Sequence, residues 1–391
     1  MKQRWLKWLL VGLVLAAGAL YFFQDSLVKY FLRPMGNGAA REGLRTVNMS
    51  AGESDEDYDG PQIETVAENL AIPWEIVFLP DESLLVTERP GQLVRIFPDS
   101  REVLPITGVA HVGEGGLLGM ALHPDFEENS WLYLYFTTRT DGGLTNRIER
   151  YRFNMAANSL ADRLVIIEGI PGAQFHDGGR LEFGPDDLLY VTTGDAGNQD
   201  SAQDVNLVAG KILRLNDDGS VPADNPFSNA VYSYGHRNPQ GLAWDGEGRL
   251  WSSEHGPSGS QTGDDEVNLI KAGSNYGWPV VRGTQTREGM VPPVIESGRS
   301  ETWAPADAAI VDDLLIFTGL RGEALYSAEI IGEDLRNFTA HFDGEYGRLR
   351  AVVVSPDGQW LYFTTSNTDG RGQPAAADDR IVRVRTSLWK K

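Results

Sequence analysis

The chain of 391 residues contains no cysteine. Without a thiol there is no disulfide, no thiolate metal ligand, no cysteine nucleophile and no attachment point for a lipoprotein anchor. A C-x-x-C-H motif is also missing, which excludes a covalently attached haem. No glycine-rich fingerprint stands between a strand and a helix, so nothing indicates a nicotinamide dinucleotide site.

Basic charge is scarce. The chain has 34 Lys and Arg against 55 Asp and Glu, which gives a formal net charge of −21. Binding to nucleic acid requires a basic face that neutralises phosphates, so nucleic acid is excluded as an expected partner. A basic pocket inside an acidic protein remains compatible with this balance.

Long apolar runs are absent except for one, at residues 8–23, which follows Lys2, Arg4 and Lys7. Its length approaches the roughly 20 residues that span a bilayer, and the preceding positive charge favours a cytoplasmic N-terminus. A small-x-small cleavage site is lacking. We therefore expect residues 1–23 to anchor the chain in the inner membrane, with a cleaved signal peptide as the alternative. Residues 24–61 are expected to form a flexible acidic spacer, and the rest lies on the periplasmic side.

The remainder of the chain repeats one pattern six times: an apolar pair, a turn rich in Pro, Asp and Gly, and an alternating strand. The apolar residues that precede the six turns are Phe78, Leu122, Phe183, Trp244, Ile310 and Val354. No long stretch here has a helical period. Spacings of 44 to 66 residues with several strands per unit predict an all-β fold, a six-bladed β-propeller over residues 62–391. The extra residues of the three longer units are expected to be loops collected on one face.

Those longer units contain the most distinctive segments. They are FHDGGR (175–180), YGHRNPQG (234–241), SEHGP (253–257), GDDEVNLI (263–270) and GSNYGWP (273–279), and GRLR (347–350) follows near the end. In this order the segments resemble the soluble glucose dehydrogenase and aldose sugar dehydrogenase family, the glucose/sorbosone dehydrogenases, which are quinoproteins that use pyrroloquinoline quinone (PQQ). The resemblance covers residues 62–391.

The resemblance implies an enzyme that oxidises aldose sugars or related alcohols, with PQQ and Ca²⁺ as cofactors. His176 matches the catalytic base, a role that suits a side chain titrating near neutrality. Asp195 matches the acidic residue that orients this histidine. In isolation, His176 would be a loop histidine bonded to backbone, and Asp195 a turn residue.

Cofactor contacts are implied for seven residues: Glu114, Arg237, Asn238, Gln240, Arg321, Arg348 and Arg350. PQQ carries three carboxylates, and arginine grips carboxylates through paired hydrogen bonds. Two positions depart from the family pattern. Arg321 stands where a lysine is expected, and Glu114 stands where some members carry glutamine, which adds negative charge near the site.

Calcium ligands are implied at two places. Gly256 and Pro257 match a site that binds Ca²⁺ through backbone carbonyls beside the quinone, where the ion would act as a Lewis acid. Glu266 and the main-chain oxygen of Tyr276 match a second, structural Ca²⁺ site. Taken alone, the acidic run around Glu266 would be a solvated turn.

Two other functions remain open on the same architecture. One is a calcium-dependent lactone hydrolase, which would need carboxylate metal ligands around the axis and no arginine cluster. The other is a non-enzymatic propeller that binds a protein or a glycan. For a dehydrogenase, the partners would be a sugar substrate and an external electron acceptor, a membrane quinone or a cytochrome.

Overall fold

The computed structural model describes residues 60–257 and 263–389, together with the backbone of a short strand, β1 (Arg45–Val47). The expected anchor at 1–23 and most of the expected spacer lie outside the described residues. Within the described part of the chain, no helix has the length and apolar character needed to cross a bilayer.

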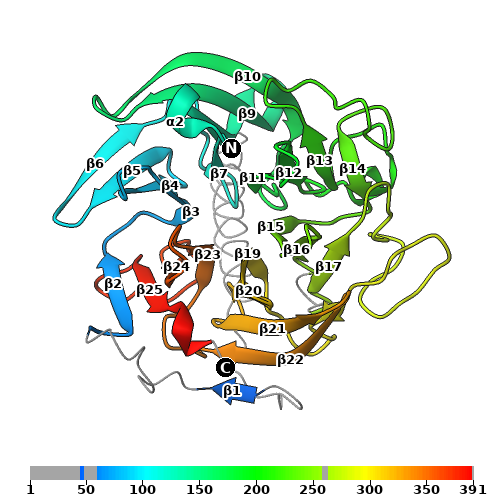
Figure 1. Ribbon diagram of the computed structural model, residues 1–391. Coiled ribbons are helices and arrows are strands. Elements are labelled where there is room, and N and C mark those ends of the chain that lie inside the picture. Colours follow the sequence, from blue (N-terminus) through cyan, green and yellow to red (C-terminus); the bar gives the residue numbers. More distant parts are fainter. Residues whose placement is uncertain (1–44, 48–59, 258–262, 390–391) are drawn as a thin grey trace, which may run out of the picture. The chain divides into compact units, whose positions relative to one another are not determined.

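The described residues form six sheets arranged in a ring, so the predicted six-bladed β-propeller is confirmed (Figure 1). Each blade starts with a strand near the axis and adds strands outward. Blade 1 consists of β3 (Pro73–Phe78), β4 (Leu84–Glu88), β5 (Gln92–Phe97) and β6 (Ser100–Pro105). Blade 2 consists of β7 (Leu117–Leu122), β8 (Trp131–Thr140), β9 (Gly143–Asn154) and β10 (Ser159–Pro171). Blade 3 consists of β11 (Leu181–Phe183), β12 (Leu189–Thr193), β13 (Lys211–Leu215) and β14 (Val231–Tyr234).

The second half of the ring repeats this plan. Blade 4 consists of β15 (Pro239–Trp244), β16 (Leu250–Glu254), β17 (Glu266–Ile270) and β18 (Ile295–Glu296). Blade 5 consists of β19 (Pro305–Val311), β20 (Leu314–Gly319), β21 (Leu325–Ile331) and β22 (Asp334–His341). Blade 6 consists of β23 (Leu349–Val354), β24 (Trp360–Thr365) and β25 (Ile381–Arg385), completed by β2 (Ile63–Ala67). The only α-helix among the described residues, α2 (Phe126–Asn129), is four residues long.

Both ends of the propeller therefore meet in one sheet, because β2 pairs antiparallel with β25, with Ile63 opposite Val384. The strand β1, which falls within the expected spacer, pairs parallel with the outer strand β22. An open ring would expose two unpaired strand edges, and this pairing removes them.

Apolar side chains from adjacent blades interlock. Each of the six buried apolar clusters joins neighbouring blades, as in the cluster that contains Leu85 of β4 and Leu134 of β8. A blade in such a ring is covered on both faces, which is why strands such as β12 are buried at every position. The core is thus a set of six interfaces around the axis.

The six apolar residues used to define the repeat all fall at or next to the end of an innermost strand, so the first hairpin of every blade is correctly predicted. The expectation that the extra residues are loops is wrong for blade 2. There they lengthen β9 to 12 residues and β10 to 13 residues. An alternating pattern shows that a strand exists but sets no limit on how far two paired strands extend.

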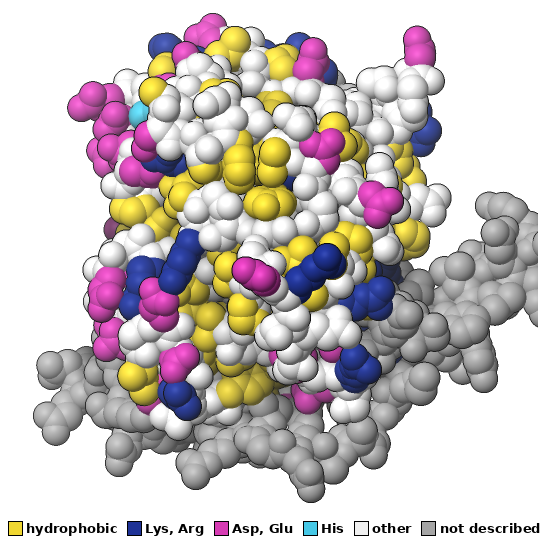
Figure 2. Space-filling view, turned by 90° about the vertical axis from the view of Figure 1, so that its right-hand side faces the viewer, with side chains coloured by type: hydrophobic (Ala, Val, Ile, Leu, Met, Phe, Trp, Pro, Cys, Tyr) yellow, Lys and Arg dark blue, Asp and Glu magenta, His cyan; other side chains and the backbone are white. Residues whose placement is uncertain are grey.

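Antiparallel pairing gives the ring two distinct ends. The innermost strands begin, and the second strands finish, at what we call the site end. The hairpin turns that join them lie at what we call the turn end. Viewed from the side, acidic and basic side chains are interspersed with apolar ones (Figure 2). The loops at the site end contain the segments 175–180 and 234–241, so the candidate site lies there.

Candidate active site

The centre of the site is the pair formed by His176, in the loop before β11, and Asp195, just after β12. Nδ1 of His176 lies 2.7 Å from Oδ1 of Asp195. Asp195 is fully buried and also accepts hydrogen bonds from the Gly197 N–H (2.8 Å) and from Nε1 of Trp278 (2.9 Å). Burial alone would raise the pKa of Asp195, but the hydrogen bonds from His176, Gly197 and Trp278 lower it overall. An ionised Asp195 fixes the proton of His176 on Nδ1 and leaves Nε2 as a base.

The backbone at His176 is strained, with φ at +63°, in the left-handed region that a residue with a side chain rarely adopts. The facing residue must be a glycine, because a Cβ at Gly194 would lie 1.8 Å from the His176 carbonyl oxygen. Such conformations persist where surrounding contacts enforce them, and they concentrate at functional sites. Gly178 is held by a hydrogen bond from its N–H to Oδ1 of Asn238 (3.0 Å).

Glu114, the first departure from the family pattern, supports this loop. Its Oε2 accepts the His176 N–H at 3.0 Å, and its Oε1 accepts Nη1 of Arg371 at 2.8 Å. Although burial alone would raise it, the guanidinium of Arg371, together with the hydrogen bond from the His176 N–H, holds the pKa of Glu114 well below its usual range. The extra negative charge expected near the site is therefore present, and Arg371 of blade 6 compensates it.

Three buried arginines gather at the same end of the ring. Arg89 follows β4, Arg237 precedes β15, and Arg350 lies on β23. Burial lowers the pKa of Arg89 and of Arg237, and burial together with Arg89 and Arg348 lowers the pKa of Arg350 to about 9. Burial disfavours all three charges, and neighbouring arginines disfavour that of Arg350 further, so the cluster suits an anion with several charges.

Three other predicted cofactor contacts differ in what holds their side chain or backbone. Gln240 positions Arg350, because its Oε1 accepts Nη1 of that arginine at 3.2 Å. Arg348 is held by Asp369, which accepts its Nη2 at 2.7 Å and its Nε at 3.1 Å. Arg321 follows β20 and is half-buried, and its N–H donates to the Trp303 carbonyl at 3.0 Å. The structure thus brings Arg350 and Arg237 into the site, while Arg348 already has a carboxylate partner.

Four buried polar atoms at the site have no hydrogen-bond partner among the described residues: Nδ2 of Asn238, Nε2 of His255, Nε of Arg89 and Oδ2 of Asp177. Burial, reinforced by Arg237 and Arg350, lowers the pKa of His255 to about 3, so its ring is neutral. Buried polar groups in folded proteins are nearly always paired, so these atoms are available to pair with water or with the polar groups of a ligand. Together with the arginines they fit a polar, multiply charged cofactor.

The predicted catalytic calcium site lies in the loop after β16. The Gly256 N–H donates to Oδ1 of Asp265 at 2.7 Å, and Oδ2 of Asp265 accepts the N–H groups of Trp303 (2.7 Å) and Ala304 (3.0 Å). Asp265 therefore fixes the loop that presents Gly256 and Pro257. No group of three or more His, Cys, Asp or Glu placed to hold a metal occurs within residues 60–257 and 263–389, but carbonyl ligands would not form such a group.

At the second predicted calcium site, three glutamates stand side by side across blade 4. Glu266 on β17 is paired in register with Glu254 on β16 and with Glu296 on β18. Burial, followed by these like charges, raises the pKa of Glu266 to about 8. Tyr276 uses its hydroxyl within the blade, donating to the Leu269 carbonyl at 2.7 Å. A cation beside Glu266 would relieve the repulsion, which fits the predicted chemistry.

Sequence reasoning missed several residues of this site: Arg89, His255, Trp278, Asp369 and Arg371. His255 and Trp278 lie inside segments that were singled out, but no role was assigned to them. Arg89, Asp195 and Arg371 all lie in loops that follow the second strand of a blade. That shared position is the signal that could have identified them.

The fold and the site define a six-bladed propeller with a histidine–aspartate pair and buried arginines at one end of the ring. The chain belongs to the Glucose / Sorbosone dehydrogenase family, whose model matches residues 70–381. It is 35% identical over 343 residues to an aldose sugar dehydrogenase of Escherichia coli K12, covering 79% of this chain and 91% of that one.

Two further comparisons agree with this family. Over 261 residues the chain is 38% identical to quinoprotein glucose dehydrogenase B of Acinetobacter calcoaceticus, a match that covers 58% of this chain and 54%, about half, of that relative. The solved PQQ-bound aldose sugar dehydrogenase of Streptomyces coelicolor superposes with a TM-score of 0.77 and 39% identity, covering 83% of this chain and 97% of that one.

Proposed function

We propose that the protein is a PQQ- and calcium-dependent dehydrogenase that oxidises aldose sugars, or related alcohols, to lactones. The observation that carries this proposal is the His176–Asp195 pair, at 2.7 Å, on the same end of the ring as Arg89, Arg237 and Arg350. The reaction requires a base that removes a hydroxyl proton, and His176 is such a base. It also requires cations that bind a cofactor with three carboxylates, and the buried arginines are such cations.

The chain's own groups act on the proton. Nε2 of His176 accepts the proton of the substrate hydroxyl, while Nδ1–H stays hydrogen-bonded to Asp195. The buried carboxylate of Asp195 stabilises the imidazolium that results, and Trp278 and Gly197 keep that carboxylate in place. Glu114 maintains the strained backbone from which His176 points into the site. PQQ, when bound, supplies the oxidant that takes the hydride from the carbon bearing the hydroxyl.

Among the residues of the site, Arg350 and Arg237 would hold PQQ carboxylates, and the unpaired Nδ2 of Asn238 would donate to the cofactor. The carbonyls of Gly256 and Pro257 would bind Ca²⁺ as a Lewis acid, and Glu266 with the Tyr276 carbonyl would bind a structural Ca²⁺. Arg321 and Arg348 are weaker candidates for binding the cofactor. The guanidinium of Arg348 is already paired with the carboxylate of Asp369.

Reconstitution tests the proposal directly. The purified full chain, freed of metal, is mixed with PQQ and Ca²⁺, and the reduction of an artificial electron-accepting dye is followed with a panel of aldoses. We expect turnover only when both cofactors are present, with EDTA-treated protein as the control. Absence of PQQ binding by calorimetry would refute the proposal. Hydrolysis of a lactone with Ca²⁺ alone would support the hydrolase alternative instead.

Two properties outside the site complete the proposal. Electrons leave to a separate acceptor, a membrane quinone or a cytochrome, because the sequence has no motif for an attached haem. Residues 1–23 anchor the enzyme to the inner membrane with the propeller on the periplasmic side. Protease treatment of spheroplasts checks the second property: the propeller should be degraded while a cytoplasmic marker survives.

A further inference from the structure

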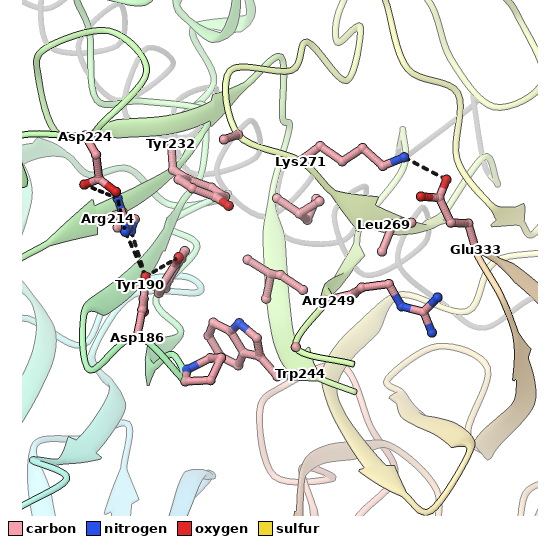
Figure 3. Close-up of a pocket in the computed structure, with 15 residues that line it drawn as sticks. Asp186, Tyr190, Arg214, Asp224, Tyr232, Trp244, Arg249, Leu269, Lys271 and Glu333 are labelled. Carbon is pink, nitrogen blue, oxygen red and sulfur yellow. Dashed lines mark hydrogen bonds and ion pairs between the residues drawn. The ribbon is translucent and has the colours of Figure 1, made fainter. Parts of the chain in front are cut away.

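A groove with a volume of about 380 Å³ lies between blades 3 and 4 (Figure 3). It is at the turn end of the ring: Trp244, which lines it, is the last residue of β15, whereas Arg237 and Asn238 stand just before that strand begins. A strand of six residues is about 20 Å long. The groove is therefore separate from the site around His176.

One wall of the groove is aromatic. The ring of Tyr190 meets the ring of Tyr232 edge to face, with centroids 5.1 Å apart, and meets the ring of Trp244 in the same way, also at 5.1 Å. Tyr190 is buried, while Tyr232 and Trp244 are half-buried. Nε1 of Trp244 has no hydrogen-bond partner among the described residues. The wall thus offers ring surface and an N–H donor to a ligand.

The polar lining is balanced in charge. Arg214, Arg249 and Lys271 stand against Asp186, Asp224 and Glu333 (Figure 3). Each cation already has an acidic partner: Arg214 lies 2.9 Å from Asp186, Arg249 lies 2.7 Å from Asp245, and Lys271 lies 2.7 Å from Glu333. An anionic ligand would have to displace these carboxylates, and a cationic ligand would have to displace the basic groups. The lining therefore favours a neutral ligand.

We infer that this groove is a second saccharide site, which binds a short neutral oligosaccharide away from the oxidation site. A sugar ring has an apolar C–H face that packs on aromatic rings, and its hydroxyls both donate and accept hydrogen bonds. Ion pairs fixed around an aromatic wall supply both kinds of partner. The volume falls within the range of about 300–1,000 Å³ that small-molecule sites occupy. Binding here does not depend on the chemistry at His176.

Titration calorimetry tests the inference with the full chain in the absence of PQQ. The probes are the methyl glycosides of cellotriose and maltotriose, in which the methyl group blocks the anomeric hydroxyl and thereby prevents oxidation at that carbon. We expect saturable binding of at least one probe, and the same affinity in His176→Ala. Absence of saturable binding, or loss of binding in His176→Ala, would overturn the inference.

Variants locate the site. Trp244→Leu should weaken binding about tenfold or more, because an aromatic residue at the centre of a contact contributes most of its affinity. Phe78→Leu is the matched control, since Phe78 ends the innermost strand of blade 1, is half-buried and also packs edge to face, against Tyr362 at 5.1 Å. It should leave affinity unchanged. Equal affinity in Trp244→Leu and the wild type would refute the site.

Tyr232→Phe guards against a folding defect, because it keeps the ring and removes only the hydroxyl. We expect a loss of affinity of a few-fold, with unchanged dye-linked glucose oxidation. A trisaccharide of uronic acids should bind no better than the neutral probes. Tighter binding of the acidic probe would overturn the assignment of a neutral ligand.

Discussion

The two ends of the ring are built in different ways. At the turn end, each hairpin is closed by its own residues: Asp81 accepts the N–H (3.2 Å) and hydroxyl (2.6 Å) of Ser83, and Asp245 accepts the N–H groups of Glu247 and Arg249 at 3.0 Å. At the site end, the contacts join distant parts of the chain. Arg371 and Glu114 are 257 residues apart, and Arg350 and Gln240 are 110 apart.

This difference has a consequence for mutation. The geometry of a turn that is held by local hydrogen bonds does not depend on the other blades, so changes at the turn end should act on one blade. The site end exists only when the blades close around the axis, so changes there should alter chemistry and cofactor affinity. Between the two ends, buried charges on the innermost strands hold the blades together.

The largest effect is expected at His176. His176→Ala should lower kcat by about 10²–10⁴-fold, since it removes the general base, while PQQ affinity stays unchanged. Stopped-flow dye reduction and PQQ titration measure the two quantities. His123→Ala, a histidine beside the turn after β7, is the matched control and should retain full turnover. Near-normal kcat in His176→Ala would show that the base lies elsewhere.

Arg180 is expected to have the largest effect on stability. It is fully buried on the axis, paired with Glu75 of blade 1 and, at 3.1 Å, with Asp307 of blade 5. Arg180→Met would leave two buried carboxylates without their cation and should lower the free energy of unfolding by about 3–5 kcal/mol in urea titrations. Arg383→Met, which breaks a half-buried pair with Glu64, should change it by about 1 kcal/mol or less. Equal losses of unfolding free energy in Arg180→Met and Arg383→Met would show that the buried pairs contribute no more than the half-buried pair.

Arg350 should affect cofactor binding with little loss of stability. Arg350→Met removes charge-assisted hydrogen bonds to PQQ and should raise its Kd by about 10–100-fold. Because burial and neighbouring arginines already lower the pKa of Arg350 to about 9, the PQQ-free protein should be no less stable than the wild type. Calorimetric titration and urea unfolding of the same sample decide both points. A large loss of stability would indicate a structural role.

A pH dependence is expected from Asp177, which is buried next to His176. Burial raises the pKa of Asp177 to about 6. The folded state then holds a proton that the unfolded state has released, so this stabilisation is complete below about pH 4 and is lost as the pH rises through 6. Its size is up to about 3 kcal/mol. Urea unfolding at pH 5 and pH 8 should show a smaller difference for Asp177→Asn than for the wild type. The same difference in Asp177→Asn as in the wild type would refute the raised pKa of Asp177.

The smallest effect is expected from Glu114→Gln. The amide oxygen can still accept the His176 N–H, but Arg371 loses its ion pair. We expect kcat to change only a few-fold. A double-mutant cycle with Arg371→Gln should show that the two residues are coupled. Strict additivity of the two variants would mean that the ion pair has no effect on turnover.

Much of the fold was accessible from the sequence because its signals are local. The apolar pair and Asp-containing turn mark the first hairpin of every blade, and the segments around His176 and Asn238 carry most of the site. What the sequence did not reveal depends on which side chains pair between separate loops. Arg348 was expected to face the cofactor with Arg350, yet Asp369, from the loop after β24, holds its guanidinium. The pairing of Arg371 with Glu114 is far more remote in sequence, because the two residues are 257 positions apart.

The pairing of β2 with β25 also bears on how the molecule forms. During synthesis the last strand emerges after all other blades, so the ring cannot close until translation of the propeller is complete. Closing a loop of this length has a large entropic penalty before any contact forms, which makes closure a late step. Five blades could fold earlier and form an open arc, with an unpaired strand edge exposed at each end. Loss of residues 381–385 to an exopeptidase would leave that arc unclosed and would loosen the sheet that carries Arg350.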